Sequence, residues 1–209
     1  MTTAPAARIS VVLLAAGESS RMAQPKQSLL WQGVPLLRYQ VEQLLATTAQ
    51  EIVVVLGFKA GEFAAILKQV NPGGRAKLAL NPNYRYGKTT SIKIGVENVS
   101  EEATDIVILA VDQPRPAAVY QRLFDAHVQG KNLITVPAYQ GKHGHPPVFD
   151  ASLAQELGQM TEEKQGVREV IERHRDGLRA VEFDTPAVLT NLNTPEDYQQ
   201  ALKQFGQKA

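Results

Sequence analysis

Short runs of aliphatic residues alternate along the chain with longer segments in which apolar positions recur at helical spacing. Two of these runs, 9–14 and 52–56, are apolar throughout apart from Ser10, which is typical of strands covered on both faces of a parallel sheet. A third run, 105–110, leads into Val111 and Asp112. The predicted strands are 9–14, 52–56, 77–80, 105–110, 133–136 and 178–183.

The segments between these strands predict helices. In 35–45, for example, apolar side chains recur every three or four residues and so share one face. The segment 86–91 predicts a loop that enters a helix with Thr89 or Thr90 as its N-cap. The last helix has a clear start, because Thr194 is followed by Pro and two acids. The predicted helices are 35–45, 60–70, one that begins near 89 and buries Ile92, Val96 and Val99, 117–128, two pieces within 153–174, and 194–205.

This alternation of strands and helices predicts an α/β fold, a three-layer sandwich around a mostly parallel, Rossmann-like sheet. The segment 137–149 is rich in Gly, His and Pro, so it breaks the alternation and predicts a small antiparallel element. No internal repeat, low-complexity segment or Pro/Ser-rich linker divides the chain. We therefore expect one domain over 1–209, with residues 1–7 flexible.

The composition adds to this prediction only by excluding some classes of function and of metal site. With 22 basic and 21 acidic residues, a net charge of +1 and no long block of either sign, the chain lacks the concentrated basic surface that nucleic-acid binding needs. It contains no cysteine, which excludes disulfides, thiolate metal sites and thiol nucleophiles. Any metal must be held by oxygen or histidine ligands.

The N-terminal residues lack the basic start and apolar stretch of a signal peptide, and no apolar run approaches the ~20 residues that span a bilayer. We therefore expect a cytoplasmic protein without membrane contact.

In parallel α/β sheets, ligands bind beyond the carboxyl ends of the strands, where the strand order reverses. This rule selects the loop 15–26 after the first strand and Asp112 after the strand 105–110, and both should face one cleft. A Walker motif is excluded, because the only Gly-Lys-Thr of the chain is at 87–89 and the Gly required five residues before Gly87 is Pro82. The loop is not a dinucleotide fingerprint either, since no glycine follows Gly17 before Gly33.

What remains is a loop of small residues whose N–H groups can approach a polyphosphate, followed by Arg21 and Lys26 to neutralise its charge. The alternative is an ordinary turn with surface cations, and the residues by themselves leave both open. Asp112 has a similar alternative as a turn cap before Pro114, and Asn193 as a turn residue. His143 and His145 lack a third ligand nearby in sequence, which disfavours a zinc site.

Several motifs resemble one enzyme family over nearly the whole chain. They are L-A-A-G-E-S-S-R-M-A-Q-P-K at 14–26, N-P-N-Y-R-Y-G-K-T-T-S-I-K-I-G at 81–95, V-D-Q-P at 111–114, G-H-P-P-V-F at 144–149 and N-L-N-T-P-E-D-Y at 191–198. The sequence resembles nucleotidyltransferases that join a nucleoside monophosphate to a small phosphorylated acceptor, and most nearly the molybdenum-cofactor branch with its cytidylyltransferases. The resemblance implies the fold of the nucleotide-diphospho-sugar transferases.

The resemblance also implies roles for particular residues. Backbone groups of Leu14, Ala15, Ala16 and Gly17 would hold the base and ribose, Arg21 and Lys26 the triphosphate, and Thr90 and Ser91 would lie near the nucleotide. Asp112 would bind Mg²⁺, with Asn193 as a second ligand or as the residue that orients its water. His145 and Arg168 would lie toward the acceptor. Relatives that use guanine nucleotides usually carry A-G-G where this chain has A-A-G at 15–17, which favours cytidine.

The expected reaction is the Mg²⁺-dependent transfer of CMP from CTP to a molybdopterin-type phosphorylated acceptor, with release of pyrophosphate and Arg21, Lys26 and Asp112 as catalytic residues. Alternatives are the use of GTP, another acceptor such as a sugar phosphate or methylerythritol phosphate, or a non-catalytic nucleotide-binding or cofactor-carrier protein. The branch also implies transient contact with an enzyme that receives the finished cofactor.

Overall fold

The computed structural model describes residues 7–71, 73–162 and 166–206. The expectation of a flexible N-terminus concerns residues 1–7, of which 1–6 lie outside the described residues.

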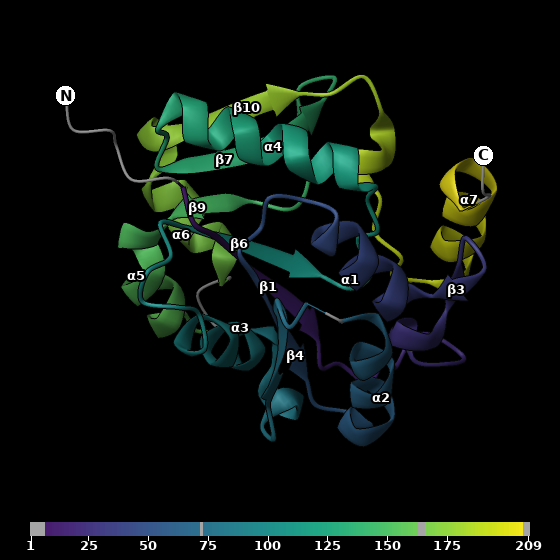
Figure 1. Ribbon diagram of the computed structural model, residues 1–209. Coiled ribbons are helices and arrows are strands. Elements are labelled where there is room, and N and C mark those ends of the chain that lie inside the picture. The colour runs from purple at the N-terminus through teal and green to yellow at the C-terminus, as the bar shows by residue number, and fades with distance from the viewer. Residues whose placement is uncertain (1–6, 72, 163–165, 207–209) are drawn as a thin grey trace.

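One mixed sheet forms the middle layer of the molecule (Figure 1). Its strand order is β5-β4-β1-β6-β9-β7-β10, in which β9 runs antiparallel to both of its neighbours and the other pairs in this order are parallel. The bounds are β1 Ile9–Ala15, β4 Glu51–Leu56, β5 Ala76–Leu80, β6 Asp105–Ala110, β7 Ile134–Tyr139, β9 Val148–Asp150 and β10 Leu178–Glu182. The mostly parallel sheet predicted from the sequence is confirmed.

Two smaller features are antiparallel. The short strand β8 (Lys142–His143) pairs with β7, so the element predicted within 137–149 is confirmed. The strand predicted over 133–136 is longer than expected, because Ala138 and Tyr139 pair with β8. A separate hairpin of β2 (Leu30–Trp31) and β3 (Val34–Pro35) was not predicted, since strands of this length leave no periodic signal.

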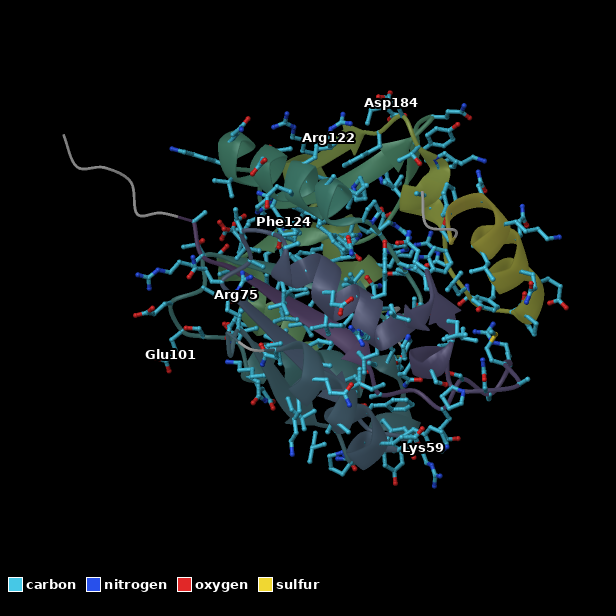
Figure 2. All side chains as sticks on the ribbon, turned by 45° about the vertical axis from the view of Figure 1, so that its right-hand side comes forward. Lys59, Arg75, Glu101, Arg122, Phe124 and Asp184 are labelled. Atoms are coloured by element: carbon cyan, nitrogen blue, oxygen red, sulfur yellow. The ribbon has the colours of Figure 1, made fainter. Side chains whose placement is uncertain are left out.

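Helices cover both faces of the sheet. Side chains of β1 alternate between the two cores: Val11 and Leu13 pack with α1, α2 and α4, whereas Val12 packs with α3, α5 and α6. The bounds are α1 Leu36–Leu45, α2 Ala60–Val70, α3 Lys88–Glu97, α4 Ala117–Gly130, α5 Ala154–Gln159, α6 Val167–Arg173 and α7 Pro195–Phe205. Figure 2 shows Phe124 inside the molecule and Lys59, Glu101 and Asp184 at its periphery. No helix within the described ranges is long and apolar enough to cross a membrane.

The predicted helix starts had different outcomes. Thr194 caps α7 as expected, and Asp197 completes a reciprocal capping box. The prediction of Thr89 or Thr90 as the N-cap of α3 is wrong, because Gly87 holds that position and the helix begins at Lys88. The Thr89 N–H instead donates to the carboxylate of Glu162, 2.6 Å away. A residue 73 positions away in sequence therefore supplies the cap, which no local pattern could show.

The strand order locates the ligand-binding edge. From β1 the chain proceeds to β4 and β5 on one side, while β6 pairs with the other side of β1. The order therefore reverses between β1 and β6, and their carboxyl ends, at Ala15 and Ala110, border a crevice of the kind that binds ligands in such sheets.

Gly95 tests how tightly α3 packs on the sheet. A Cβ atom there would overlap the side chain of Val12, so we expect Gly95→Ala to destabilise the protein by about 1–3 kcal/mol. Gly61 in α2 has nothing within 4 Å of such an atom, so Gly61→Ala should instead stabilise it by roughly 0.5 kcal/mol. Urea unfolding of both variants checks this, and equal effects would contradict the close packing.

Candidate functional site

A cleft of about 600 Å³ lies at the carboxyl ends of β1 and β6. Most residues that the sequence selected line this cleft, although they come from distant parts of the chain. They are Leu14, Ala15, Ala16, Gly17, Arg21, Lys26, Ser91, Asp112, His145 and Asn193. The loop 15–26 and Asp112 thus face one cleft, as the topology rule predicted.

The loop after β1 is held from beneath by a buried glutamine. The side-chain amide of Gln27 donates to the carbonyl oxygens of Ala15 (2.7 Å) and Gly17 (3.1 Å). The hydroxyl of Ser19 accepts the backbone N–H of Lys26, which closes the loop at 2.9 Å. Among the residues that the structure describes, no acceptor receives the backbone N–H groups of 17–21. These groups are available to an anion in the cleft.

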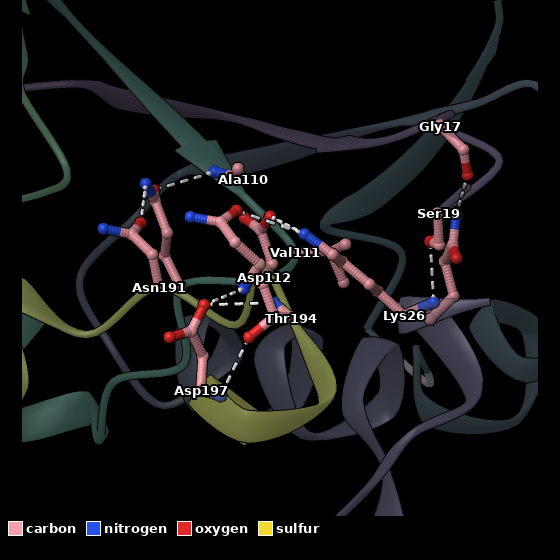
Figure 3. A network of polar contacts seen from close by, with 12 residues as sticks. Gly17, Ser19, Lys26, Ala110, Val111, Asp112, Asn191, Thr194 and Asp197 are labelled. Carbon is pink, nitrogen blue, oxygen red and sulfur yellow. Dashed lines mark hydrogen bonds and ion pairs between the residues drawn. The ribbon is translucent and has the colours of Figure 1, made fainter. Parts of the chain in front are cut away.

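Three side chains meet at the centre of the cleft (Figure 3). Lys26 places its Nζ 2.6 Å from Oδ2 of Asp112 and 3.3 Å from Oδ1 of Asn193. The side chains of Lys26 and Asp112 are only 12% and 19% exposed, so solvent screens their ion pair less than it would at the surface. A carboxylate and an amide oxygen therefore converge on one cation.

Two further contacts fix this arrangement. The backbone N–H of Leu192 donates to the carbonyl of Asp112 at 2.9 Å. The buried side chain of Gln113 donates to Oδ1 of Asn191 (2.7 Å) and accepts the N–H of Ala110 (3.3 Å). The segment that carries Asn193 is thereby tied to the end of β6. Sequence reasoning missed these roles of Gln113 and Asn191, although both lie within motifs that it quoted.

Arg115 is a buried cation behind the cleft, and it is fully inaccessible to solvent. Its guanidinium donates to the carbonyl oxygens of Pro114 (2.8 Å), Val188 (2.9 Å) and Thr190 (2.8 Å). Burial lowers the pKa of Arg115 to about 10, so the group stays charged at neutral pH. It clamps 188–190, next to Asn191, against the end of β6. The sequence offered no signal, since all three partners are backbone carbonyls.

The family model described as the MobA-like NTP transferase domain matches residues 11–180. The chain belongs to this family. It is therefore a nucleotidyltransferase, and the match includes the loop after β1, Asp112 and His145.

Two curated relatives match this chain over nearly its whole length and nearly theirs. The molybdenum cofactor cytidylyltransferase of Escherichia coli (strain K12) is 23% identical over 207 residues, which cover 94% of this chain and 97% of the relative. The molybdenum cofactor guanylyltransferase of Rhodobacter capsulatus is 29% identical over 205 residues, 97% of this chain and 99% of the relative. By contrast, the chain spans 23% of the bifunctional protein GlmU of Sorangium cellulosum, to which it is 31% identical over 110 residues.

A solved structure of similar fold is Rv0371c from Mycobacterium tuberculosis H37Rv. Its TM-score is 0.78 at 26% identity, covering 95% of this chain and 99% of that chain. The complex of Rv0371c with manganese has a TM-score of 0.75 at 24% identity, over 94% and 98% of the two chains. These likenesses confirm the predicted fold class.

His145 lines the transferase cleft, where it is exposed. Its backbone N–H donates to Val188 at 3.0 Å, and a Cβ on the preceding Gly144 would overlap that same carbonyl. Desolvation by the surrounding cleft wall, followed by the nearby charges of Lys88 and Arg115, lowers the pKa of His145 to about 4. The imidazole is therefore neutral at pH 7.

Two predicted residues lie apart from the cleft lining. Thr90 donates its hydroxyl hydrogen to the carbonyl of Gly87, 2.8 Å away, in the first turn of α3. Arg168 is exposed on α6.

At the mouth of the cleft, the carboxylate of Glu18 accepts hydrogen bonds from Arg85 (2.6 Å) and from the hydroxyl of Tyr84 (3.2 Å). Sequence reasoning missed this contact. Both Tyr84 and Arg85 line the cleft.

The neutral His145 predicts a pH dependence. The unfolded chain protonates this residue near pH 6.5, whereas the folded protein does so only near pH 4. Between these values the unfolded state binds more protons, so His145 lowers the stability as the pH falls from about 6.5 to about 4. Urea unfolding between pH 4 and 8 should show that wild type loses more stability over this window than His145→Gln. Parallel curves would contradict the lowered pKa.

Proposed function

We propose that this nucleotidyltransferase transfers CMP from CTP to a molybdopterin-type phosphorylated acceptor and releases pyrophosphate. The observation that carries the proposal is the convergence of Lys26, Asp112 and Asn193 beside the backbone N–H groups of 17–21. A polyphosphate needs several hydrogen-bond donors and cations at one place, and an oxygen-ligated metal needs carboxylate and amide oxygens beside them.

The residues present fit a Mg²⁺ ion. Within 7–71, 73–162 and 166–206 no group of three or more His, Asp and Glu residues could hold a metal. Mg²⁺ does not require such a group, since it is commonly held by one or two carboxylates with substrate phosphates and water. Asp112 and Asn193 would hold the ion, because their oxygens already converge on one cation, the ammonium group of Lys26. The manganese complex of Rv0371c supports a divalent ion. When bound, the ion would neutralise phosphate charge.

On the nucleotide side, the backbone of Leu14, Ala15, Ala16 and Gly17 would hold the base and ribose, with Ser91 and Thr90 nearby. Arg21 would bind the triphosphate. Lys26 would turn from Asp112 to the phosphates, since its backbone N–H is bonded to Ser19 of the loop while its side chain extends into the cleft. The two cations thereby replace the water that a triphosphate loses in the cleft.

The transfer exchanges one phosphate–oxygen bond for another. An oxygen of the acceptor phosphate attacks the α-phosphorus of CTP in line, and the bond to the β-phosphate oxygen breaks as pyrophosphate leaves. The acceptor phosphate is already ionised at neutral pH, so the protein supplies no general base. Lys26 and Arg21 orient the triphosphate and stabilise the charge that develops on the leaving group.

The acceptor would bind on the side of His145 and Arg168. A neutral His145 offers one hydrogen-bond donor and one acceptor, which suits a polar heterocycle better than a second phosphate. A molybdopterin-type acceptor is supported by the two molybdenum cofactor relatives that match the whole chain. Guanylyl transfer from GTP is the second candidate, because one of these relatives is a guanylyltransferase.

The direct test is pyrophosphate release with Mg²⁺ and each of CTP, GTP, UTP and ATP, with and without molybdopterin carrying its metal. We expect release only with the acceptor present, and fastest with CTP. Fastest release with GTP would establish the second candidate. Nucleotide binding without release with molybdopterin, a sugar phosphate or methylerythritol phosphate would overturn transferase activity in favour of a nucleotide-binding protein.

Asp112→Asn separates the metal role from simple packing, because the amide keeps the shape of the carboxylate but loses its charge. We expect the rate of Mg²⁺-dependent release to fall by about 10³-fold or more, in the range seen when a single charge-stabilising group is removed. Asp125→Asn on the exposed face of α4 is the matched control and should retain the full rate. An active Asp112→Asn variant would refute the metal assignment.

A further inference from the structure

Asn81 is a buried polar residue at the end of β5, and only 1% of its surface is exposed. Its backbone N–H donates to the carbonyl of Leu56 at 2.8 Å, which fixes the main chain at this position. Neither the topology rule nor the resemblance assigned it a role. Its side chain points toward the first turn of α3, where Thr90 and Ser91 accept its hydrogen bonds.

The orientation of the Asn81 amide is fixed by a backbone group. The N–H of Asn83 lies 2.9 Å from Oδ1, and a backbone N–H can only donate. The amide nitrogen must therefore point the other way, where it lies 2.9 Å from the hydroxyl oxygens of both Thr90 and Ser91. A flipped amide would face one N–H with another, so the hydrogen-bond direction at both hydroxyls is determined.

The hydroxyl hydrogens of Thr90 and Ser91 then differ in whether an acceptor lies near them. Thr90 donates its hydrogen to the carbonyl of Gly87 at 2.8 Å, within the helix start. Ser91 also accepts from Asn81, but within the part of the chain that the structure describes its own hydroxyl hydrogen meets no acceptor. Ser91 lines the cleft together with Ala15, Ala16 and Gly17. The site therefore presents a hydrogen-bond donor at this point of its wall.

We infer that Asn81 is a specificity-determining positioning residue, which acts through Ser91 to present a donor to a ring acceptor of the nucleobase. This inference rests on the proposed function. Cytosine carries an unprotonated ring nitrogen, N3, next to its O2 acceptor, whereas the corresponding nitrogen of uracil carries a hydrogen. A fixed donor at Ser91 therefore favours cytosine over uracil, because uracil would place one donor against another.

The sharpest test reverses the hydrogen-bond direction without changing the shape. In Asn81→Asp both carboxylate oxygens only accept, so one keeps the Asn83 N–H and the other takes the hydroxyl hydrogen of Ser91. Ser91 would then present a lone pair to the base. We expect wild type to bind CTP more tightly than UTP in the presence of Mg²⁺. The preference for CTP over UTP should fall by about tenfold in the variant, as the loss of one hydrogen bond in a desolvated site implies.

Equilibrium binding of the two nucleotides to the full chain, without acceptor, gives this ratio directly. Asn83→Asp is the matched control, since it adds the same charge two residues away on an exposed side chain, and it should keep the wild-type ratio. Ser91→Ala should also lower the ratio, but less than Asn81→Asp, because it removes the donor without presenting a lone pair in its place. Adding Asn81→Ala to Ser91→Ala should change the ratio no further, because Asn81 acts through the serine.

Two results overturn the inference while leaving the proposed function intact. One is a folded Asn81→Asp protein with the wild-type ratio. The other is a further change of ratio when Asn81→Ala is added to Ser91→Ala, and this comparison decides the matter if Asn81→Asp does not fold. In the first case, a loss of affinity for both nucleotides with this unchanged ratio would assign Asn81 a structural role only. A wild-type protein that binds no nucleoside triphosphate would overturn the proposed function, and this inference with it.

Discussion

The central strand β1 is hydrogen-bonded to β4 on one edge and β6 on the other, and its side chains are buried on both faces. The strand itself therefore offers no surface to a ligand, and the ligand-binding loop follows its carboxyl end. Because β6 runs parallel to β1, Asp112 is delivered to the same edge as the loop after Ala15. The contact between Lys26 and Asp112 is the local consequence of this register, and the cleft is formed around it.

Buried polar side chains, rather than the sheet itself, set the shape of the cleft. Gln27 holds the loop after β1, Gln113 and Arg115 hold the segment 188–193, and Asn81 holds the start of α3. Most of their partners are backbone carbonyls or short polar side chains. Such groups are costly to bury unless they are bonded, so each makes its loop adopt one conformation rather than many. A site that must align two anionic substrates benefits from this rigidity.

Two charged contacts cross between the loops around the cleft. Glu18 binds Arg85 at the mouth, and Glu162 occupies the N-terminus of α3, where a helix attracts negative charge. Glu18 comes from the predicted loop 15–26, and Glu162 from between the two helical pieces predicted within 153–174. Their partners could not be read locally, because pairing over 67 and 73 residues depends on how the layers stack.

By itself the sequence determined the fold class, the approximate bounds of the long helices and of the main strands, and the convergence of the loop 15–26 with Asp112 on one cleft. Apolar runs, helical spacing and the topology of parallel sheets are local or general constraints, so they can be recognised from the sequence alone. The Thr194 cap of α7 was also readable, since the groups that signal it lie within four residues.

Only the tertiary structure decided which polar side chains support the site. The cap of α3, the clamp made by Arg115 and the lowered pKa of His145 arise from contacts between elements far apart in sequence. The direction in which Asn81 polarises Ser91 depends on a single backbone N–H at Asn83. Desolvation and hydrogen-bond direction are properties of packed surroundings, and the order of residues along a chain does not contain them until the chain has folded.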